Sequence, residues 1–235
     1  LAALLLLFAI MKTDSFTRVS TWQAMGVAFP EFGIMALGVM LTMITGGIDL
    51  SSVGIANMTA IASATVMLSI APSGADAGQQ ATAVLVGVVL SIVLGTLAGV
   101  FNGFLVSKVR IPAILVTLGT LELFTGIAIV ISAGKPLSGL PPAYSALLGG
   151  KILRIPMPLI IIVVVALIIG FILTKMAFGK KLYMIGSNAT AAKFSGLNSV
   201  SLLVRTYALS GLCAGVAGLV MMANYNSAKA DYGVA

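Results

Sequence analysis

Long runs of apolar residues dominate the chain, and short polar segments separate them. Six runs lie at residues 27–45, 50–71, 81–107, 111–133, 157–174 and 202–223. A membrane-spanning helix needs about 20 mostly apolar residues, whereas the strands of a membrane barrel alternate over about 10. Because these runs are apolar all the way round, they predict helices that have lipid or other helices on every side.

A shorter apolar run occupies residues 1–11. It has no basic segment before it and no clear cleavage site after it, so a signal peptide fits it poorly. We interpret it as the second half of a helix that starts before residue 1, and we also expect a truncation after Ala235. The pattern predicts an all-α, polytopic membrane bundle of one domain, residues 1–235, truncated at both ends.

Composition agrees with a membrane protein. Hydrophobic residues make up 60% of the chain and charged residues 8%, and the mean hydropathy is +1.16. A soluble domain has about 25% charged residues. The net charge of +7 comes from cations at the ends of the apolar runs, with no interleaved aromatic residues, which argues against nucleic-acid binding.

The chain lacks several kinds of chemistry. It has no histidine, and its one cysteine, Cys213, lies inside an apolar run. Imidazole-based metal sites, proton relays and catalytic triads are therefore excluded, and no metal or cofactor is expected. The phosphate-binding pattern GxxxxGK[ST] is absent, so any use of ATP must come from another chain. We expect no catalytic residue.

Charge suggests an orientation. If residues 1–11 run from the cytoplasm outward and later spans alternate, seven cations lie inside and six outside, a weak bias of the expected sign. The inside set is Lys108, Arg110, Lys175, Lys180, Lys181, Lys193 and Arg205. The connection 134–156 is then external, and its Pro and Gly content predicts turns and short helical pieces. The polar connection 178–201 is internal.

Glycines recur at the spacing of helix packing. The run 81–107 contains a doubled GxxxG pattern, and the run 202–223 repeats it once. Small residues on one face let two helix backbones approach closely in lipid. We expect packing within the bundle at Gly95, Gly99, Gly103, Gly211 and Gly215.

The internal connection predicts one short helix. Asn188 is a good N-cap, "ATAAKFS" follows at helical length, and Gly196 lies where a left-handed C-cap is wanted. Such a helix is suited to docking in a groove of another protein. The alternative is a helix that rests on the lipid surface.

The segment "MITGGIDLSSVG", residues 43–54, interrupts two spans. Gly46 and Gly47 loosen a helix, and Asp49 or Ser51 can cap the next one. One interpretation is a break that lines a pathway or acts as a hinge at membrane depth. The other is a tight turn at the cytoplasmic end, and periodicity does not separate the two.

Polar side chains inside spans are candidate functional groups. Glu122 lies in the middle of the run 111–133, where an ionisable group is costly and usually faces a cavity or a partner. We expect it to face water or bridge helices rather than face lipid. Asn57 and Asn102 are weaker cases of the same kind.

Three segments resemble the permeases of ribose-type sugar ABC (ATP-binding-cassette) importers. They are "LGVMLTMITGGIDLSSVG", "VRIPAILVTLGTLELFTGIAIVISAGKPLSG" and "GSNATAAKFSGLNSVSLLVRTYALSGLCAGVAGL", in the family's order. The chain departs from the family pattern in having Ala189-Thr190 where Pro-Glu is common, and an apolar residue or Thr around Thr125 where Arg is common. It also has fewer spans than the family's ten or so.

The resemblance implies a transporter subunit in the bacterial inner membrane without enzyme activity. Its implied partners are cytoplasmic ABC ATPase subunits, a second permease subunit, identical or related, and a periplasmic solute-binding protein, which segments around 134–156 would receive. The cytoplasmic helix would couple the ATPase to the bundle, and the helix break would lie near the solute path or its gate. The implied coupling residues are Gly186, Asn188, Thr190, Ala191, Ala192, Lys193, Ser195 and Gly196, and the pathway or gate residues are Thr45, Gly46, Gly47, Asp49, Ser51, Asn102 and Glu122.

Two other classes of function remain open. An ion-driven secondary transporter also uses broken helices and buried carboxylates. A membrane scaffold without transport activity is the third class. The capped polar loop favours the ABC importer, because a secondary transporter does not require it.

Overall fold

The computed structural model describes residues 11, 16 and 18–233. Within them, six helices are long and apolar enough to cross a membrane. They are α3 (Val19–Ile44), α4 (Ser52–Ile70), α5 (Ala77–Phe104), α6 (Ala113–Ser132), α8 (Met157–Lys175) and α11 (Ser199–Tyr225). A π-helical stretch, η1 (Leu105–Val109), extends α5. The predicted helical membrane bundle is confirmed, whereas the predicted partial span lies outside the described residues except for Met11.

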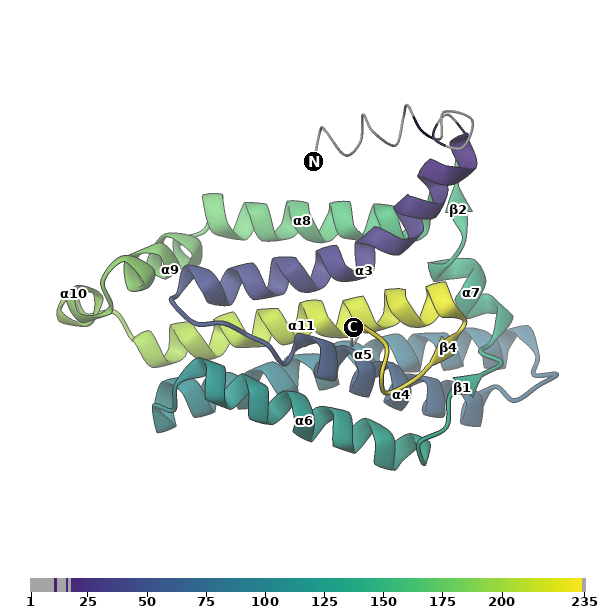
Figure 1. The fold of residues 1–235 in the computed structure, drawn as a ribbon, viewed down its shortest axis with the longest axis horizontal. Helices are drawn as coiled ribbons and strands as arrows, with labels where there is room; N and C mark the ends of the chain where they lie inside the picture. The colour runs from purple at the N-terminus through teal and green to yellow at the C-terminus, as the bar shows by residue number, and fades with distance from the viewer. Residues whose placement is uncertain (1–10, 12–15, 17, 234–235) are drawn as a thin grey trace.

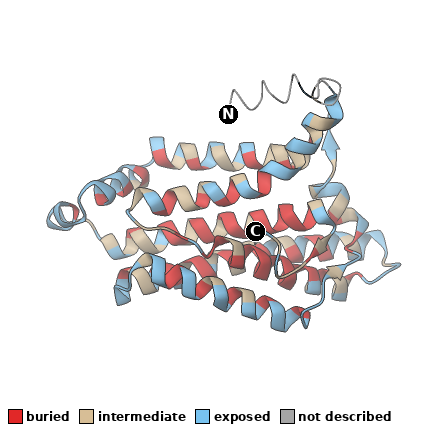
Figure 2. Ribbon diagram, in the orientation of Figure 1, coloured by how far each residue is buried: buried red, intermediate tan, exposed pale blue. Residues whose placement is uncertain are grey.

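Helix α11 forms the centre of the bundle. It packs against α5, α3 and α4, while α8 lies beside α3 and α6 beside α4 (Figure 1). Buried residues concentrate on α11 and α4 and thin out on α6 and α8 (Figure 2). The outer helices therefore present apolar side chains outward, as is expected of surfaces that meet lipid or a second subunit.

The first helix is longer than predicted. It begins at Val19, whereas the sequence predicted a start at residue 27. The predicted start is too late because the first turns of α3 carry polar residues, which a search for apolar runs omits. Gln23 there donates to the carbonyl of Arg154 at 3.1 Å and accepts from Lys151 at 2.9 Å, which ties the start of α3 to the connection 134–156. Farther along, α3 changes direction in Figure 1, and Pro30 lies in its interior. Proline removes one helical hydrogen bond and bends the helix.

One end of the bundle carries small elements in the connection 134–156. These are β1 (Leu137–Ser138), α7 (Pro142–Leu148), β2 (Lys151–Ile152) and β3 (Ile155–Pro156). Strand β2 pairs antiparallel with β3, and β1 pairs antiparallel with β4 (Ser227–Ala228) after α11. The predicted short helical piece is present as α7, but the strand pairs were not predicted. Tyr144 on α7 is buried and donates to the carbonyl of Leu219 at 2.6 Å. Burial raises the pKa of Tyr144 well above its ordinary value, so its hydroxyl stays protonated.

The opposite end carries two helices where the sequence predicted one. The additional helix is α9 (Ala177–Ser187), which precedes α10 (Ala189–Phe194). Its buried residues are Gly179, Leu182 and Ile185, three positions apart, so they lie on one face and pack on the bundle. The apolar face was not predicted, because the connection 178–201 was treated as polar throughout.

The glycine patterns lie where α5 and α11 approach each other. A Cβ atom at Gly99 would overlap the carbonyl oxygen of Tyr207, and one at Gly211 would overlap that of Gly95. A Cβ atom at Gly215 would lie 2.7 Å from the carbonyl oxygen of Ser91, and one at Gly103 would lie 2.8 Å from the Cα atom of Val204. These contacts are between backbones, so a neighbouring side chain cannot simply turn away.

Candidate functional site: the helix break and the groove beside α6

Helix α3 ends in a glycine turn. Gly46 adopts a φ of +84°, and its N–H donates to the carbonyl of Met43 at 3.0 Å. The hydroxyl of Thr45 donates to the carbonyl of Thr42 at 2.7 Å. A residue in the left-handed region after the last turn is the usual way to end a helix, and glycine adopts it without a steric cost.

The chain then runs back along the bundle in extended form before α4 begins (Figure 1). Oδ2 of Asp49 accepts from the hydroxyl of Ser210 at 2.7 Å. Ser210 is the twelfth of the 27 residues of α11, which places Asp49 about 16 Å along that helix. The glycine turn itself lies beside α9, at one end of the bundle, and the extended segment after it reaches the interior. The structure therefore combines features of both interpretations, a turn at the end of the bundle and a break at depth.

Four side chains form what we call the break cluster: Asp49, Ser51, Asn102 and Ser210. Oδ1 of Asp49 accepts from the backbone N–H of Ser51 at 3.1 Å and from its hydroxyl at 2.6 Å. Asn102 donates to that hydroxyl at 2.7 Å. Asp49 is only 1% exposed, and its described hydrogen-bond donors are uncharged. The cluster joins the break to α5 and α11, and the N-terminus of α4 favours the nearby negative charge.

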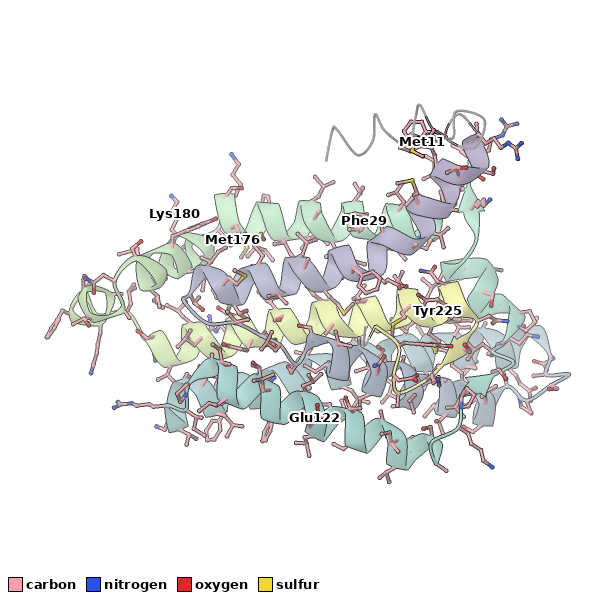
Figure 3. All side chains as sticks on the ribbon, in the orientation of Figure 1. Met11, Phe29, Glu122, Met176, Lys180 and Tyr225 are labelled. Atoms are coloured by element: carbon pink, nitrogen blue, oxygen red, sulfur yellow. The ribbon has the colours of Figure 1, made fainter. Side chains whose placement is uncertain are left out.

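Glu122 lies on the outward side of α6. It is the tenth of the 20 residues of that helix, and Figure 3 labels it near the midpoint of α6. Among the described residues it makes no hydrogen bond or ion pair, so it does not bridge two helices of this chain. It lines a groove of about 380 Å³, which we call the α6 groove, with Leu121, Thr125, Ile129, Gly134, Lys229, Ala230 and Asp231.

The other wall of the α6 groove is the segment 226–233, which we call the return segment. After α11 it turns at Asn226, with a φ of +48°, pairs through β4 with β1, and runs back beside the bundle (Figure 1). The amide of Asn57 on α4 holds it by donating to the carbonyls of Ala230 and Tyr232 at 2.9 and 2.8 Å. Asn57 is therefore a structural anchor for backbone that is not helical.

An ion pair lies on the return segment. Lys229 donates to Asp231 at 2.7 Å. This hydrogen bond and the charge of the carboxylate raise the pKa of Lys229, so its ammonium stays protonated at neutral pH. No local pattern of residues predicted that Lys229 and Asp231 lie beside Glu122, because the return of the chain after α11 was not predicted.

Helices α9 and α10 form a projection at the far end of the bundle, at the left of Figure 1. Oδ1 of Asn188 accepts from the N–H of Ala191 at 2.9 Å, and Gly196 has a φ of +80°, so both predicted caps of the short helix are present. Gly186 abuts the carbonyl of Ile44, the last residue of α3. Ala192 is buried, whereas Phe194 is 88% exposed.

A wide cavity of about 700 Å³ opens beside α10. Thr190 and Lys193 line it together with Arg110, which follows η1 and has a φ of 65°. The predicted coupling residues thus divide into two groups. Ala192 is buried, and Gly186 abuts the end of α3 although it is exposed. The others lie on the exposed side: Asn188, Thr190, Ala191, Lys193, Ser195 and Gly196.

The family model described as "Branched-chain amino acid transport system / permease component" matches residues 24–235. The chain belongs to this family. It is similar to the Autoinducer 2 import system permease protein LsrD of Enterobacter sp. (strain 638), with 32% identity over 86% of the chain and 60% of the relative. It is 31% identical to the galactofuranose transporter permease protein YtfT of Escherichia coli (strain K12), over 97% of the chain and 67% of the relative.

A third relative is the ribose import permease protein RbsC of Bacillus subtilis (strain 168), with 32% identity over 86% of the chain and 60% of the relative. The chain thus spans about 60 to 67% of the length of these curated relatives. No solved structure matches it. Family and fold together make this permease a multi-pass protein of the inner membrane.

One buried carboxylate of the permease was not singled out from the sequence. Glu31, the residue after Pro30 in α3, is 1% exposed. It accepts from the hydroxyl of Tyr225 at 2.9 Å and from the amide of Asn224 at 3.0 Å. Its position in an apolar run was the available signal, the same one that drew attention to Glu122.

Proposed function

We propose that this permease is the membrane subunit of an ABC importer that moves a sugar or a related small polar solute into the cell. Its partners are cytoplasmic ATPase subunits, a second permease subunit and a periplasmic solute-binding protein. Membership of a permease family and relatives named for the import of ribose, galactofuranose or autoinducer 2 support this solute class. These sugar-related names support it more directly than the broader family description does.

The observation that carries the proposal is the α9–α10 projection. It offers a capped helix with an exposed Phe194 beside a wide cavity, on a chain without a phosphate-binding motif. A short helix with small residues and one large apolar side chain is suited to docking in a groove of a second protein. We infer that an ATPase subunit holds α10 there.

The packing of α9 supplies a route from this helix to the bundle. Gly186, near the end of α9, abuts the carbonyl of Ile44, where α3 ends and the break begins. A movement of α10 would therefore reach the end of α3 through α9, which contacts both. From there the extended segment leads to Asp49, which is held by Ser210 of α11. In this proposal, closure of the ATPase subunits shifts the break and changes the side to which the solute path opens.

The test is uptake with different energy sources. We expect solute uptake in membrane vesicles to require ATP and to survive an uncoupler that collapses the ion gradient. The opposite result would indicate the ion-driven secondary transporter that buried carboxylates such as Glu31 also suit. A scaffold would give no solute-dependent uptake at all.

Substitutions in α10 test the coupling itself. Ala191→Trp should separate ATP hydrolysis from transport, lowering solute imported per ATP by about tenfold, because the added volume blocks docking. Ala191→Ser keeps the small size and is the matched control. Gly196→Pro should have the same effect as Ala191→Trp, whereas Gly196→Asn tolerates the left-handed φ and should transport normally. Unchanged uptake in Ala191→Trp and Gly196→Pro, with normal membrane insertion, would contradict the docking role.

A further inference from the structure

The α6 groove combines features that lipid does not tolerate. Glu122 lies roughly 14 Å from either end of α6, at the middle of a membrane span. The rest of the outward surface of α6 is apolar: Leu115, Leu118, Leu123, Ile127 and Val130 are all exposed. An ionisable group at this depth faces a partner or a water-filled path, because its burial in hydrocarbon costs several kcal/mol.

The return segment supplies independent evidence for the same face. Its backbone is not helical, and Asn57 holds it inside the bundle against α4. Non-helical backbone at membrane depth is tolerated only where it is buried in protein or lines an aqueous cavity. Residues 229–231 of this segment line the α6 groove, so an aqueous cavity accounts for both the carboxylate and the backbone.

The shape of the groove suits a small solute. Its volume of about 380 Å³ lies within the usual range of small-molecule sites. Its lining extends from Leu121, at the middle of α6, to Gly134, just beyond the C-terminal end of the helix. In the proposed orientation that end is external, so the groove leads from the external side to the middle of the membrane.

The charges of the groove select among solutes. Among the described residues, Lys229 is the one cation that lines it, and Asp231 already pairs with Lys229. The carboxylate left without a partner among these residues is that of Glu122. A solute carboxylate or phosphate would meet this negative charge, whereas hydroxyl groups can donate to Glu122. The groove therefore disfavours an anionic solute, and the hydroxyl groups of a neutral polyhydroxylated solute satisfy Glu122.

We propose that the α6 groove is a wall of the solute path, and that Glu122 accepts hydrogen bonds from hydroxyl groups of a neutral polyhydroxylated solute. The inference rests on the proposed transport function and adds a site and a solute class to it. Thr125 lies one turn from Glu122 on the same side of α6 and extends the polar strip toward the external end.

Thiol labelling tests the groove without depending on transport. The single native cysteine, Cys213, is buried, so an introduced cysteine reports on its own position. Thr125→Cys, in the full permease with its ATPase in right-side-out vesicles, should react with hydrophilic methanethiosulfonate reagents. With each rate divided by the rate of the same reagent with a small free thiol, the cationic ethylammonium reagent should react about tenfold faster than the anionic ethylsulfonate reagent, because of the Glu122 charge. Adding Glu122→Gln should reduce this normalised preference to about one. Leu167→Cys on α8 is the matched control, because Leu167 is 68% exposed and lines neither the α6 groove nor the apolar groove beside it that Glu122 also lines.

Protection identifies the solute class. D-Ribose or D-galactose at millimolar concentration should slow the labelling of Thr125→Cys, and L-leucine should not. Glu122→Gln should lower uptake about tenfold, the loss expected for one hydrogen bond to a charged group, while Leu123→Ala should stay within about twofold of the unsubstituted protein.

Each outcome decides a separate point. If Thr125→Cys is as unreactive as Leu167→Cys, or shows no charge preference, the groove is not an aqueous path beside Glu122 and the proposal is wrong. Protection by L-leucine alone would overturn the solute class. Uptake that does not depend on ATP would refute the proposed ABC function, while the labelling result would still decide whether the groove carries solute.

Discussion

The carboxylate of Asp49 lies inside the bundle, where uncharged groups donate hydrogen bonds to it. Ser51 and Ser210 donate to it, and Asn102 donates to Ser51 in turn. A buried charge without a counterion is costly unless its hydrogen bonds are satisfied. The break is therefore held in a defined geometry by residues of α5, of α11 and of the break itself.

Removing this carboxylate should destabilise the permease. Asp49→Ala leaves the donors of Ser51 and Ser210 unsatisfied inside the bundle, at a cost of about 1 to 3 kcal/mol each. Asp49→Asn retains one carbonyl acceptor and should be less harmful. Thermal unfolding of the protein in detergent measures the difference.

The comparison variant for that experiment is Asp76→Ala. Asp76 is an exposed N-cap that accepts from the N–H of Gln79 at 2.7 Å, so its loss should cost about 1 kcal/mol. If the midpoint of thermal unfolding is no lower for Asp49→Ala than for Asp76→Ala, the break cluster contributes little to stability.

At the scale of the helix, backbone contact between α5 and α11 organises the centre of the bundle. Glycines on both helices remove the side chains that would keep the backbones apart, and Ser91 adds a hydrogen bond to the carbonyl of Gly215 at 2.9 Å. Close packing of this kind stabilises helix pairs in lipid, where the hydrophobic effect does not drive helices together.

A pair of alanine substitutions separates packing from helix propensity. Gly99→Ala places a methyl group against the Tyr207 carbonyl and should cost about 1 to 3 kcal/mol through overpacking. Gly170→Ala on α8 meets no neighbouring atom within 4 Å and should be neutral or stabilising by up to about 1 kcal/mol. The measurement is again the thermal midpoint in detergent, and equal midpoints would argue against tight packing of α5 on α11.

At the scale of the whole molecule, charge is distributed unequally between the two ends. Residues 105–112 and 175–205, which form the end with α9 and α10, contain seven cations and no aspartate or glutamate. Positive charge of this kind is retained on the cytoplasmic side during insertion. We therefore expect the α9–α10 projection to face the cytoplasm, where a soluble ATPase could reach it.

Two introduced cysteines test this orientation. Lys180 is exposed on α9, and Lys135 is exposed at the other end of the bundle. A maleimide that does not cross membranes should label Lys135→Cys in intact spheroplasts. It should label Lys180→Cys only in inverted vesicles. The reverse pattern would put the projection outside the cell and remove the basis of the ATPase coupling.

Hydropathy, capping and glycine conformation predicted the six described spans, the caps of α10 and the presence of a break, because each of them acts over a few neighbouring residues. These local signals missed the apolar face of α9 and the early start of α3, where polar residues conceal a helix. The packed fold alone shows that Asp49 meets Ser210, that Glu31 meets Tyr225, and that Glu122 shares a groove with Lys229. Those pairings depend on how the helices pack and where the chain returns after α11, and no local pattern of residues encodes such long-range contacts.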